Sequence, residues 1–155
     1  MLQEIERKFK IKDSSFLSGM VGTKIVQGYL SADPERAVRI RTKGDQGYIT
    51  VKGKSNASGT TRFEWENIID LAEAEALLDL CIPTVISKTR YEIHLDGNTW
   101  EVDVFHDANE GLLIAEIELE HEHQNFSKPD WLGEEITGDV RYYNSYISQN
   151  PFSTW

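Results

Sequence analysis

The chain has 155 residues, 39% of them hydrophobic, and this length and composition suit one folded domain, residues 1–155, with its own core. Its 26 acidic and 16 basic residues give a net charge of -10, which opposes binding to nucleic acid or an anionic membrane by bulk attraction. The single cysteine, Cys81, excludes an internal disulfide, and without a signal-peptide core or a transmembrane run we expect a cytoplasmic protein.

Alternation of apolar and charged residues dominates the sequence and is typical of β-strands with two different faces. In the first segment, residues 2–11, the side chains of Glu4, Glu6 and Lys8 share one face. Seven more segments are predicted to be strands, separated by turn signals such as Asp96-Gly97. They are residues 25–30, 37–42, 47–52, 61–68, 87–95, 99–105 and 112–120.

Helical signals are few. Asp70 is a predicted N-cap before an apolar helical face over residues 71–78, and Asp139 precedes a second, C-terminal helical stretch. A short helix is also expected over residues 14–20. This order of elements predicts a mostly β (α+β) protein, with an eight-stranded antiparallel sheet and a few helices packed outside it.

The charged faces are segregated by sign. Neighbours at i and i+2 on one face lie roughly 7 Å apart, where like charges repel, and an ordinary surface mixes signs to avoid that cost. The acidic runs are Glu4/Glu6, Glu64/Glu66, Glu101/Asp103 and Glu116/Glu118/Glu120, and the basic runs are Arg39/Arg41 and Lys88/Arg90. For any single strand, a solvated sheet face is the alternative. If the sheet instead closes into a barrel with these faces inward, its charged interior can enclose one small ligand, and the apolar faces point outward, under the helices.

A charged interior of this kind favours a ligand, because like charges in a low-dielectric site must be neutralised or change their pKa values. Carboxylate oxygens favour Mg²⁺ or Mn²⁺, and a set of Arg and Lys side chains favours a compact polyanion such as a chain of phosphates. A metal ion together with a polyphosphate would satisfy both clusters.

The charged residues also follow a recognisable order along the chain. The first strand carries E-x-E-x-K as Glu4-Ile5-Glu6-Arg7-Lys8. The pattern continues with Gln27-Gly28-Tyr29-Leu30, Arg39-x-Arg41, Lys52, Arg62-x-Glu64-x-Glu66, Lys88-x-Arg90, Glu101-x-Asp103, Glu116-x-Glu118 and Arg141-Tyr142-x-Asn144. In this order and spacing, over nearly its whole length, the sequence resembles the CYTH superfamily of triphosphate tunnel metalloenzymes. The resemblance implies an eight-stranded antiparallel tunnel and points to the short bacterial members that cleave inorganic tripolyphosphate.

The resemblance, together with the charge pattern, also suggests roles for individual residues. The expected metal ligands are Glu4, Glu6, Asp103, Glu116 and Glu118. Candidates for a second metal ion, or for orienting basic neighbours, are Glu64, Glu66, Glu101 and Glu120. The expected triphosphate-binding residues are Lys8, Arg39, Arg41, Lys52, Arg62, Lys88 and Arg90. The catalytic candidates are Lys8, Lys88, Glu4 and Glu6, and the nucleophile would be a water molecule activated by a metal ion or a carboxylate.

We therefore expect a metal-dependent triphosphatase, a hydrolase that acts on phosphoanhydride bonds, with a small triphosphate as its substrate. The enzymatic alternatives are a thiamine or nucleoside triphosphatase and a class IV adenylate cyclase. The non-enzymatic alternative is a polyphosphate-binding module. No nucleic acid or membrane partner is expected, and the family resemblance suggests a possible homodimer.

Overall fold

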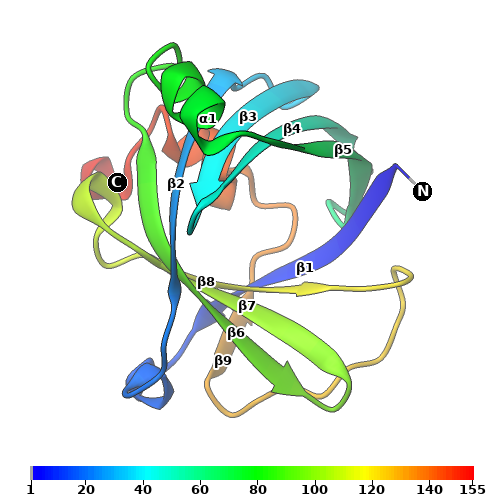
Figure 1. The fold of residues 1–155 in the computed structure, drawn as a ribbon. Helices are drawn as coiled ribbons and strands as arrows, with labels where there is room; N and C mark the ends of the chain where they lie inside the picture. The colour runs from blue at the N-terminus through cyan, green and yellow to red at the C-terminus, as the bar shows by residue number, and fades with distance from the viewer. Residues whose placement is uncertain (1) are drawn as a thin grey trace.

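The computed structural model describes residues 2–155 and contains a closed antiparallel β-barrel (Figure 1). Within these residues, nine strands form one sheet in the order β5-β4-β3-β2-β6-β7-β8-β1-β9, and β1 also pairs with β5. Their bounds are β1 Gln3–Ile11, β2 Thr23–Ser31, β3 Arg36–Lys43, β4 Gln46–Ser55, β5 Thr61–Ile69, β6 Ile86–Leu95, β7 Asn98–Phe105, β8 Leu113–Glu118 and β9 Leu132–Glu135. The eight predicted strands close the barrel, which confirms the expected fold, and the short β9 is an addition.

The barrel closes at β1, which divides its pairing between two neighbours. Residues Gln3, Glu4 and Ile5 pair with β5, whereas the stretch from Glu6 to Lys10 pairs with β8. The predicted Asp96-Gly97 turn joins β6 to β7 with a positive φ at both residues, which is the conformation of a type I′ hairpin turn. Local turn chemistry therefore sets this hairpin, whereas closure depends on residues far apart in the sequence.

The helices are short. In the described chain the α-helices are α1 Leu71–Leu78 and α2 Asn144–Ile147, and the 3-10 helices are η1 Ser15–Leu17, η2 Asp107–Asn109, η3 Val140–Tyr142 and η4 Phe152–Thr154. Asp70 occupies the N-cap position of α1 without a side-chain cap bond, whereas Asp139 caps η3 by accepting from the Arg141 amide. The helix expected over residues 14–20 is only the single turn η1. None of the helices between residues 2 and 155 is long and apolar enough to cross a membrane.

Helix α1 packs on the outside of the barrel against β2, β3 and β4 (Figure 1). Two glycines allow this close approach. A Cβ atom at Gly47 would lie 2.7 Å from the Cβ of Ala74, and one at Gly28 would lie 2.8 Å from the Cβ of Cys81. Any larger side chain at these positions would push the helix away from the sheet.

A second part of the outer surface is covered by irregular chain. The outward faces of β1, β7 and β8 contribute Phe9, Trp100 and Ile117 to a buried apolar cluster. Phe126 and Trp131, from the segment between β8 and β9, pack against Trp100 with ring centroids 5.6 and 5.7 Å away. Helices are expected over these outward apolar faces. In the structure, a loop that contains the aromatic residues Phe126 and Trp131 covers this one instead.

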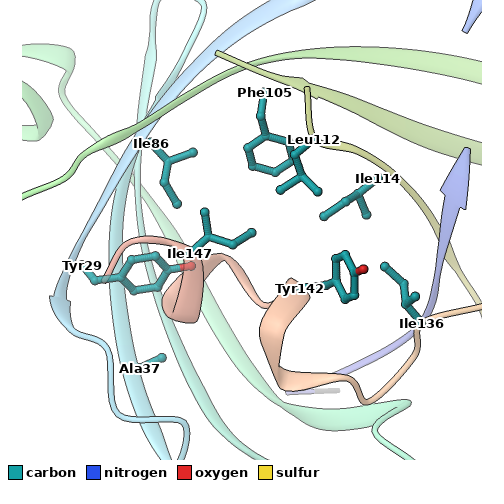
Figure 2. Close-up of a cluster of buried hydrophobic side chains, with 9 residues drawn as sticks. All are labelled: Tyr29, Ala37, Ile86, Phe105, Leu112, Ile114, Ile136, Tyr142 and Ile147. Atoms are coloured by element: carbon teal, nitrogen blue, oxygen red, sulfur yellow. The ribbon is translucent and has the colours of Figure 1, made fainter. Parts of the chain in front are cut away.

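The other apolar cluster lies at one end of the barrel (Figure 2). Its strand residues follow the same alternation as the charged ones: Ile86 is two residues before Lys88, and Ile114 is two residues before Glu116. Figure 2 shows the C-terminal residues Tyr142 and Ile147 among these strand side chains. The remaining members are Tyr29, Ala37, Phe105, Leu112 and Ile136. The expectation that apolar faces point only outward is therefore wrong at this end.

Candidate functional site

The structure brings most of the predicted charged residues together inside the barrel. Antiparallel register places Glu4 opposite Arg62, Lys8 opposite Glu116 and Arg90 opposite Asp103. Eight of the predicted residues line one cavity, namely Glu6, Lys8, Arg39, Lys52, Arg62, Lys88, Arg90 and Glu116. The other eight predicted residues are not in that lining. Seven of them lie on the barrel strands, namely Glu4, Arg41, Glu64, Glu66, Glu101, Asp103 and Glu118, whereas Glu120 lies beyond the end of β8 and is exposed.

The barrel interior is more exposed at one end than at the other. Along β6, the exposed fraction of the side chain rises from 2% at Lys88 to 8% at Arg90 and 48% at Glu92. On β7 it rises from 1% at Asp103 to 30% at Glu101. On β8, Glu116 is buried and Glu118 is exposed. Three adjacent strands therefore agree that the mouth lies at the Glu92 end and that the deep end faces the apolar cluster.

The deep end holds a tight cluster of one carboxylate and two cations. Arg90 donates to both carboxylate oxygens of Asp103, at 2.8 and 2.9 Å, and Lys88 Nζ lies 2.8 Å from Oδ2 of the same group. Burial alone would raise the pKa of Asp103, but Arg90 and Lys88 outweigh it and hold that pKa below its usual range. Burial lowers the pKa of Lys88 to about 8, even beside Asp103.

A second cluster is centred on Lys52. Its Nζ donates to Glu4 at 2.9 Å and lies 3.3 Å from Glu64. Burial would raise the pKa of Glu4, but Lys52 lowers it to about 2. Burial and the neighbouring Glu4 raise the pKa of Glu64 to about 7. The two carboxylates thus share one lysine, and Glu4 is the one that holds its negative charge.

The arginine pair of β3 keeps donors available. Arg39 and Arg41 lie 3.4 and 3.5 Å from Glu66, which also accepts from the hydroxyl of Thr50 at 2.6 Å. Among residues 2–155, the buried Nε atoms of both arginines have no hydrogen-bond partner. Burial and the neighbouring Arg39 and Arg90 lower the pKa of Arg41 to about 10. An anion between these groups would neutralise excess positive charge and accept the free hydrogen bonds.

Within the described residues, the Glu6 carboxylate has acidic neighbours but no ion-pair partner. In the described chain no Lys or Arg nitrogen lies within 4.0 Å of its side chain. Burial, together with the nearby Glu116 and Glu4, raises its pKa well above the usual range. Within residues 2–155, no group of three or more His, Cys, Asp or Glu side chains is arranged so that it could hold a metal ion. Carboxylate oxygens that repel one another are nevertheless the ligands that a hard divalent cation favours.

Neutral residues that the charge pattern cannot reveal complete the cavity. Asn144 Oδ1 accepts from Gln27 Nε2 at 2.7 Å and from Lys88 Nζ at 2.9 Å. The Tyr143 ring lies 5.3 Å from Lys8 Nζ and 5.8 Å from the Arg62 guanidinium carbon. Their only sequence signals are the Gln27-Gly28-Tyr29-Leu30 and Arg141-Tyr142-x-Asn144 patterns. Arg141 itself is exposed and paired with Asp139 at 3.0 Å, outside the cavity.

Comparison with known proteins agrees with this geometry. Residues 2–144 match the model of the CYTH domain. An inorganic triphosphatase from Acetivibrio thermocellus is 46% identical, over 100% of this chain and 99% of its own. An inorganic triphosphatase from Nitrosomonas europaea is 34% identical, over 95% of this chain and 97% of its own. A solved structure of an inorganic triphosphatase aligns with a TM-score of 0.67 and 33% identity, covering 96% of this chain and 95% of that one.

Proposed function

The chain belongs to the CYTH domain family, and on that premise we propose that it is a metal-dependent triphosphatase that hydrolyses inorganic tripolyphosphate. The observation that carries the proposal is a group of basic side chains around one cavity in a chain of net charge -10. Within the described residues this group is Lys8, Arg39, Lys52, Arg62, Lys88 and Arg90. So dense a set of cations fits a compact polyanion, and the relatives named inorganic triphosphatases favour tripolyphosphate.

The reaction is hydrolysis of one phosphoanhydride bond. The oxygen of a water molecule bonds to phosphorus, a bridging P–O bond breaks, and pyrophosphate and orthophosphate leave with one proton released. Arg39, Arg41 and the other basic residues bind the non-bridging oxygens and stabilise the negative charge that grows on the leaving oxygen. Lys8 and Lys88 are the proposed catalytic lysines, because their Nζ atoms hold protons inside the cavity wall.

The proposed metal ligands are the carboxylates on the inward faces of β1 and β8, namely Glu4, Glu6, Glu116 and Glu118. Mg²⁺ or Mn²⁺, when bound, neutralises phosphate charge and polarises a water molecule. The resemblance also includes Asp103 in this set. Both of its oxygens already accept from Arg90 and Lys88, so we propose that Asp103 orients these two cations.

The remaining carboxylates have basic partners in the wall of the cavity. Glu64 lies beside Lys52, Glu66 beside Arg39 and Arg41, and Glu101 beside Arg90. We propose that they orient these basic side chains for phosphate binding, since a fixed guanidinium loses less entropy when it binds an anion. The homodimer favoured by family habit and the cytoplasmic location stay predictions, and light scattering would test the first.

The decisive experiment measures phosphate release from tripolyphosphate, ATP and thiamine triphosphate with Mg²⁺, with Mn²⁺ and with a chelator. We expect tripolyphosphate to be hydrolysed fastest and the chelator to abolish turnover. Cyclic AMP is assayed in the same ATP reaction. Faster hydrolysis of an organic triphosphate, or formation of cyclic AMP, would contradict the proposed substrate, and binding without turnover would indicate a binding module.

A matched pair of lysines on β4 tests the site. Lys52 lines the cavity, whereas Lys54, two residues further along the strand, is exposed. Lys52→Ala is expected to lower kcat/KM for tripolyphosphate by about a hundredfold or more, as removal of a buried transition-state contact does. Lys54→Ala should stay within about twofold of the parent. Equal effects of the two substitutions would show that the cavity is not the active site.

A further inference from the structure

We propose that Thr50 and Tyr48, two neutral residues on the inward face of β4, are positioning residues that align the arginine pair of β3 for phosphate binding. They hold Arg39 and Arg41 in place and leave each guanidinium free to bind an anion. This inference rests on the proposed function and deepens it, because it names residues outside the charge pattern that prepare the phosphate-binding site.

The first support is the register between β3 and β4. Arg39 lies directly opposite Thr50, and Arg41 lies directly opposite Tyr48. Directly opposite residues of an antiparallel pair point to the same face of the sheet, so each arginine has one neutral neighbour inside the barrel. Thr50 is fully buried and lines the cavity together with Arg39. Because neither neighbour carries a charge, both arginines keep theirs for a ligand.

The second support is the direction of the hydrogen bonds around Thr50. An arginine can only donate, so Thr50 Oγ1 accepts from Arg39 Nη2 at 3.2 Å. The single hydroxyl proton of Thr50 then points to Glu66 Oε2, which accepts it at 2.6 Å. Thr50 thus connects the arginine to the carboxylate. A valine at this position would have a similar shape but could make neither bond.

The third support is how loosely Glu66 itself holds the two arginines. Its Oε2 atom lies 3.4 Å from Arg39 Nη2 and 3.5 Å from Arg41 Nη2. Arg90, by contrast, donates to both carboxylate oxygens of Asp103, at 2.8 and 2.9 Å. Charge-assisted N–H···O bonds are about 2.7–2.9 Å long, so Arg90 is tightly paired and the β3 arginines are not. The protein therefore aligns the β3 arginines but leaves their strongest hydrogen bonds to a ligand.

The fourth support comes from Tyr48 and from the unused nitrogen atoms of the pair. The Arg41 guanidinium carbon lies over the Tyr48 ring, 5.2 Å from its centre. An aromatic ring attracts a cation through its face and takes none of its strong hydrogen bonds. Within residues 2–155, the buried Nε atoms of Arg39 and Arg41 have no hydrogen-bond partner. Because a buried donor without a partner is costly, these atoms favour an anion beside the pair.

The expected consequence is tighter binding of the substrate. A flexible arginine loses conformational freedom when it binds an anion, and a side chain that is already aligned loses less. Contacts made by aligned side chains are present in the bound ground state as well as in the transition state. Loss of the alignment should therefore raise Kd and KM more than it lowers kcat.

The first experiment compares Thr50→Val, Thr50→Ser and the control Thr89→Val. Thr89 faces outward from β6 and its Oγ1 lies 2.7 Å from His106 Nε2, so its substitution removes a hydroxyl hydrogen bond outside the cavity. Hydrolysis of tripolyphosphate is measured with Mg²⁺, and binding by calorimetry in chelator. We expect Thr50→Val to raise KM and Kd by about tenfold, with kcat within about threefold. Thr50→Ser should stay within about threefold and Thr89→Val within about twofold.

Thermal melting in chelator shows whether each variant is folded. A serine variant as weak as the valine variant would overturn the inference, because the loss would then come from packing and not from the hydroxyl. A fall in kcat at unchanged KM, or an equal effect of Thr89→Val, would contradict it as well.

A double-mutant cycle tests whether Thr50 acts through Glu66. With Glu66→Ala already present, the carboxylate that Thr50 holds is gone and only its bond to Arg39 is left to lose. Thr50→Val should then raise KM by about threefold in place of tenfold, because residues in one hydrogen-bond network are not additive. The same tenfold factor in both backgrounds would show that the two residues act independently, against the proposal.

Two substitutions of Tyr48 test the ring, and they decide the inference even if Thr50→Val does not fold. Tyr48→Phe keeps the ring beside Arg41 and should leave KM within about twofold. Tyr48→Leu removes the ring and should raise KM by about threefold or more, the size of a cation–π contact. If the leucine variant matches the phenylalanine variant, the ring does not position Arg41.

The two proposals can fail separately. If tripolyphosphate is bound but not hydrolysed, the proposed activity is wrong, yet the Kd values of the Thr50 and Tyr48 variants still test the alignment. If it is hydrolysed and these variants match the parent, the activity stands and the positioning role is wrong. If it is neither bound nor hydrolysed, both proposals are wrong.

Discussion

The deep end and the open mouth of the barrel are lined by the same strands but differ in how their charges are held. At the deep end, Asp103 accepts from both Arg90 and Lys88 and is shielded from water. At the mouth, Glu92 and Glu118 are exposed, and Glu92 lies 3.5 Å from Lys43. Charges at the deep end must be paired by the protein or by a ligand, whereas those at the mouth can be solvated. An acidic side chain therefore contributes differently to the free energy of unfolding at the two ends, even where the two positions are only two residues apart on one strand.

The sharpest way to break this comparison is to remove a carboxylate from each level of β7. Asp103→Ala leaves Lys88 and Arg90 buried without their shared partner, and breaking a buried ion pair in this way costs about 3–5 kcal/mol. Glu101→Ala, two residues nearer the mouth, should cost about 1 kcal/mol or less, because solvent screens the loss. Urea denaturation at pH 7 measures both. Equal losses would mean that the two levels do not differ in dielectric environment.

The apolar cluster at the deep end offers a second comparison. Ile147 is fully buried in this cluster, and Ile68, on β5, is 65% exposed. Ile147→Ala should lower the free energy of unfolding by about 2–4 kcal/mol through lost burial and the cavity it leaves. Ile68→Ala should change it by about 0.5 kcal/mol or less. If thermal melting gives similar changes in stability for both variants, the C-terminal segment is not tightly packed against the barrel.

Glu6 tests whether the interior is strained without a ligand. Glu6→Gln removes one of three neighbouring carboxylates inside the barrel, so the metal-free protein should gain about 1 kcal/mol of stability as the repulsion with Glu116 and Glu4 is relieved. Turnover of tripolyphosphate should fall by about a hundredfold, since an expected metal ligand is lost. Thermal melting in chelator and an activity assay measure the two effects. A less stable variant in chelator would contradict the repulsion.

The same comparison extends to Glu118 at the mouth. Glu118→Gln should stabilise the metal-free protein by less than Glu6→Gln does, because Glu118 is an exposed residue, although partial burial and the neighbouring Glu4 and Glu101 also raise its pKa. A gain as large as that expected for Glu6→Gln would place the strain at the mouth as well as inside.

A small effect is also expected for an ion pair on the outer surface. Arg7 donates to Glu135 at 2.6 and 2.8 Å, and these hydrogen bonds lower the pKa of Glu135. Because the folded-state pKa is depressed, the pair stabilises the protein above the ordinary carboxyl pKa of about 4.3 and loses that contribution as pH falls through the folded-state pKa. Glu135→Gln should cost less than about 1 kcal/mol at pH 7 and nothing at low pH. Chemical denaturation at several pH values measures this, and a cost that grows as pH falls would contradict it.

Much of the fold could be predicted from local pattern. A period of two residues is built into strand geometry, so alternation revealed the eight barrel strands and which charged residues share a face. The Asp96-Gly97 turn was visible because few residues tolerate positive φ. The four-residue strand β9 was missed, since it is too short for its pattern to stand out.

The sequence by itself determined that the chain forms strands with charged faces of like sign, because both features depend on neighbours along the chain. It also carried the family resemblance in the order and spacing of those charges. Only the tertiary structure decided that Asp103 pairs with Arg90 and Lys88, because this depends on the register between β6 and β7. It also decided that the C-terminal segment packs at one end of the barrel. Contacts of this segment join Gln27 to Asn144, 117 residues apart, and Lys8 to Tyr142, 134 residues apart, and no local pattern reports pairings over such distances.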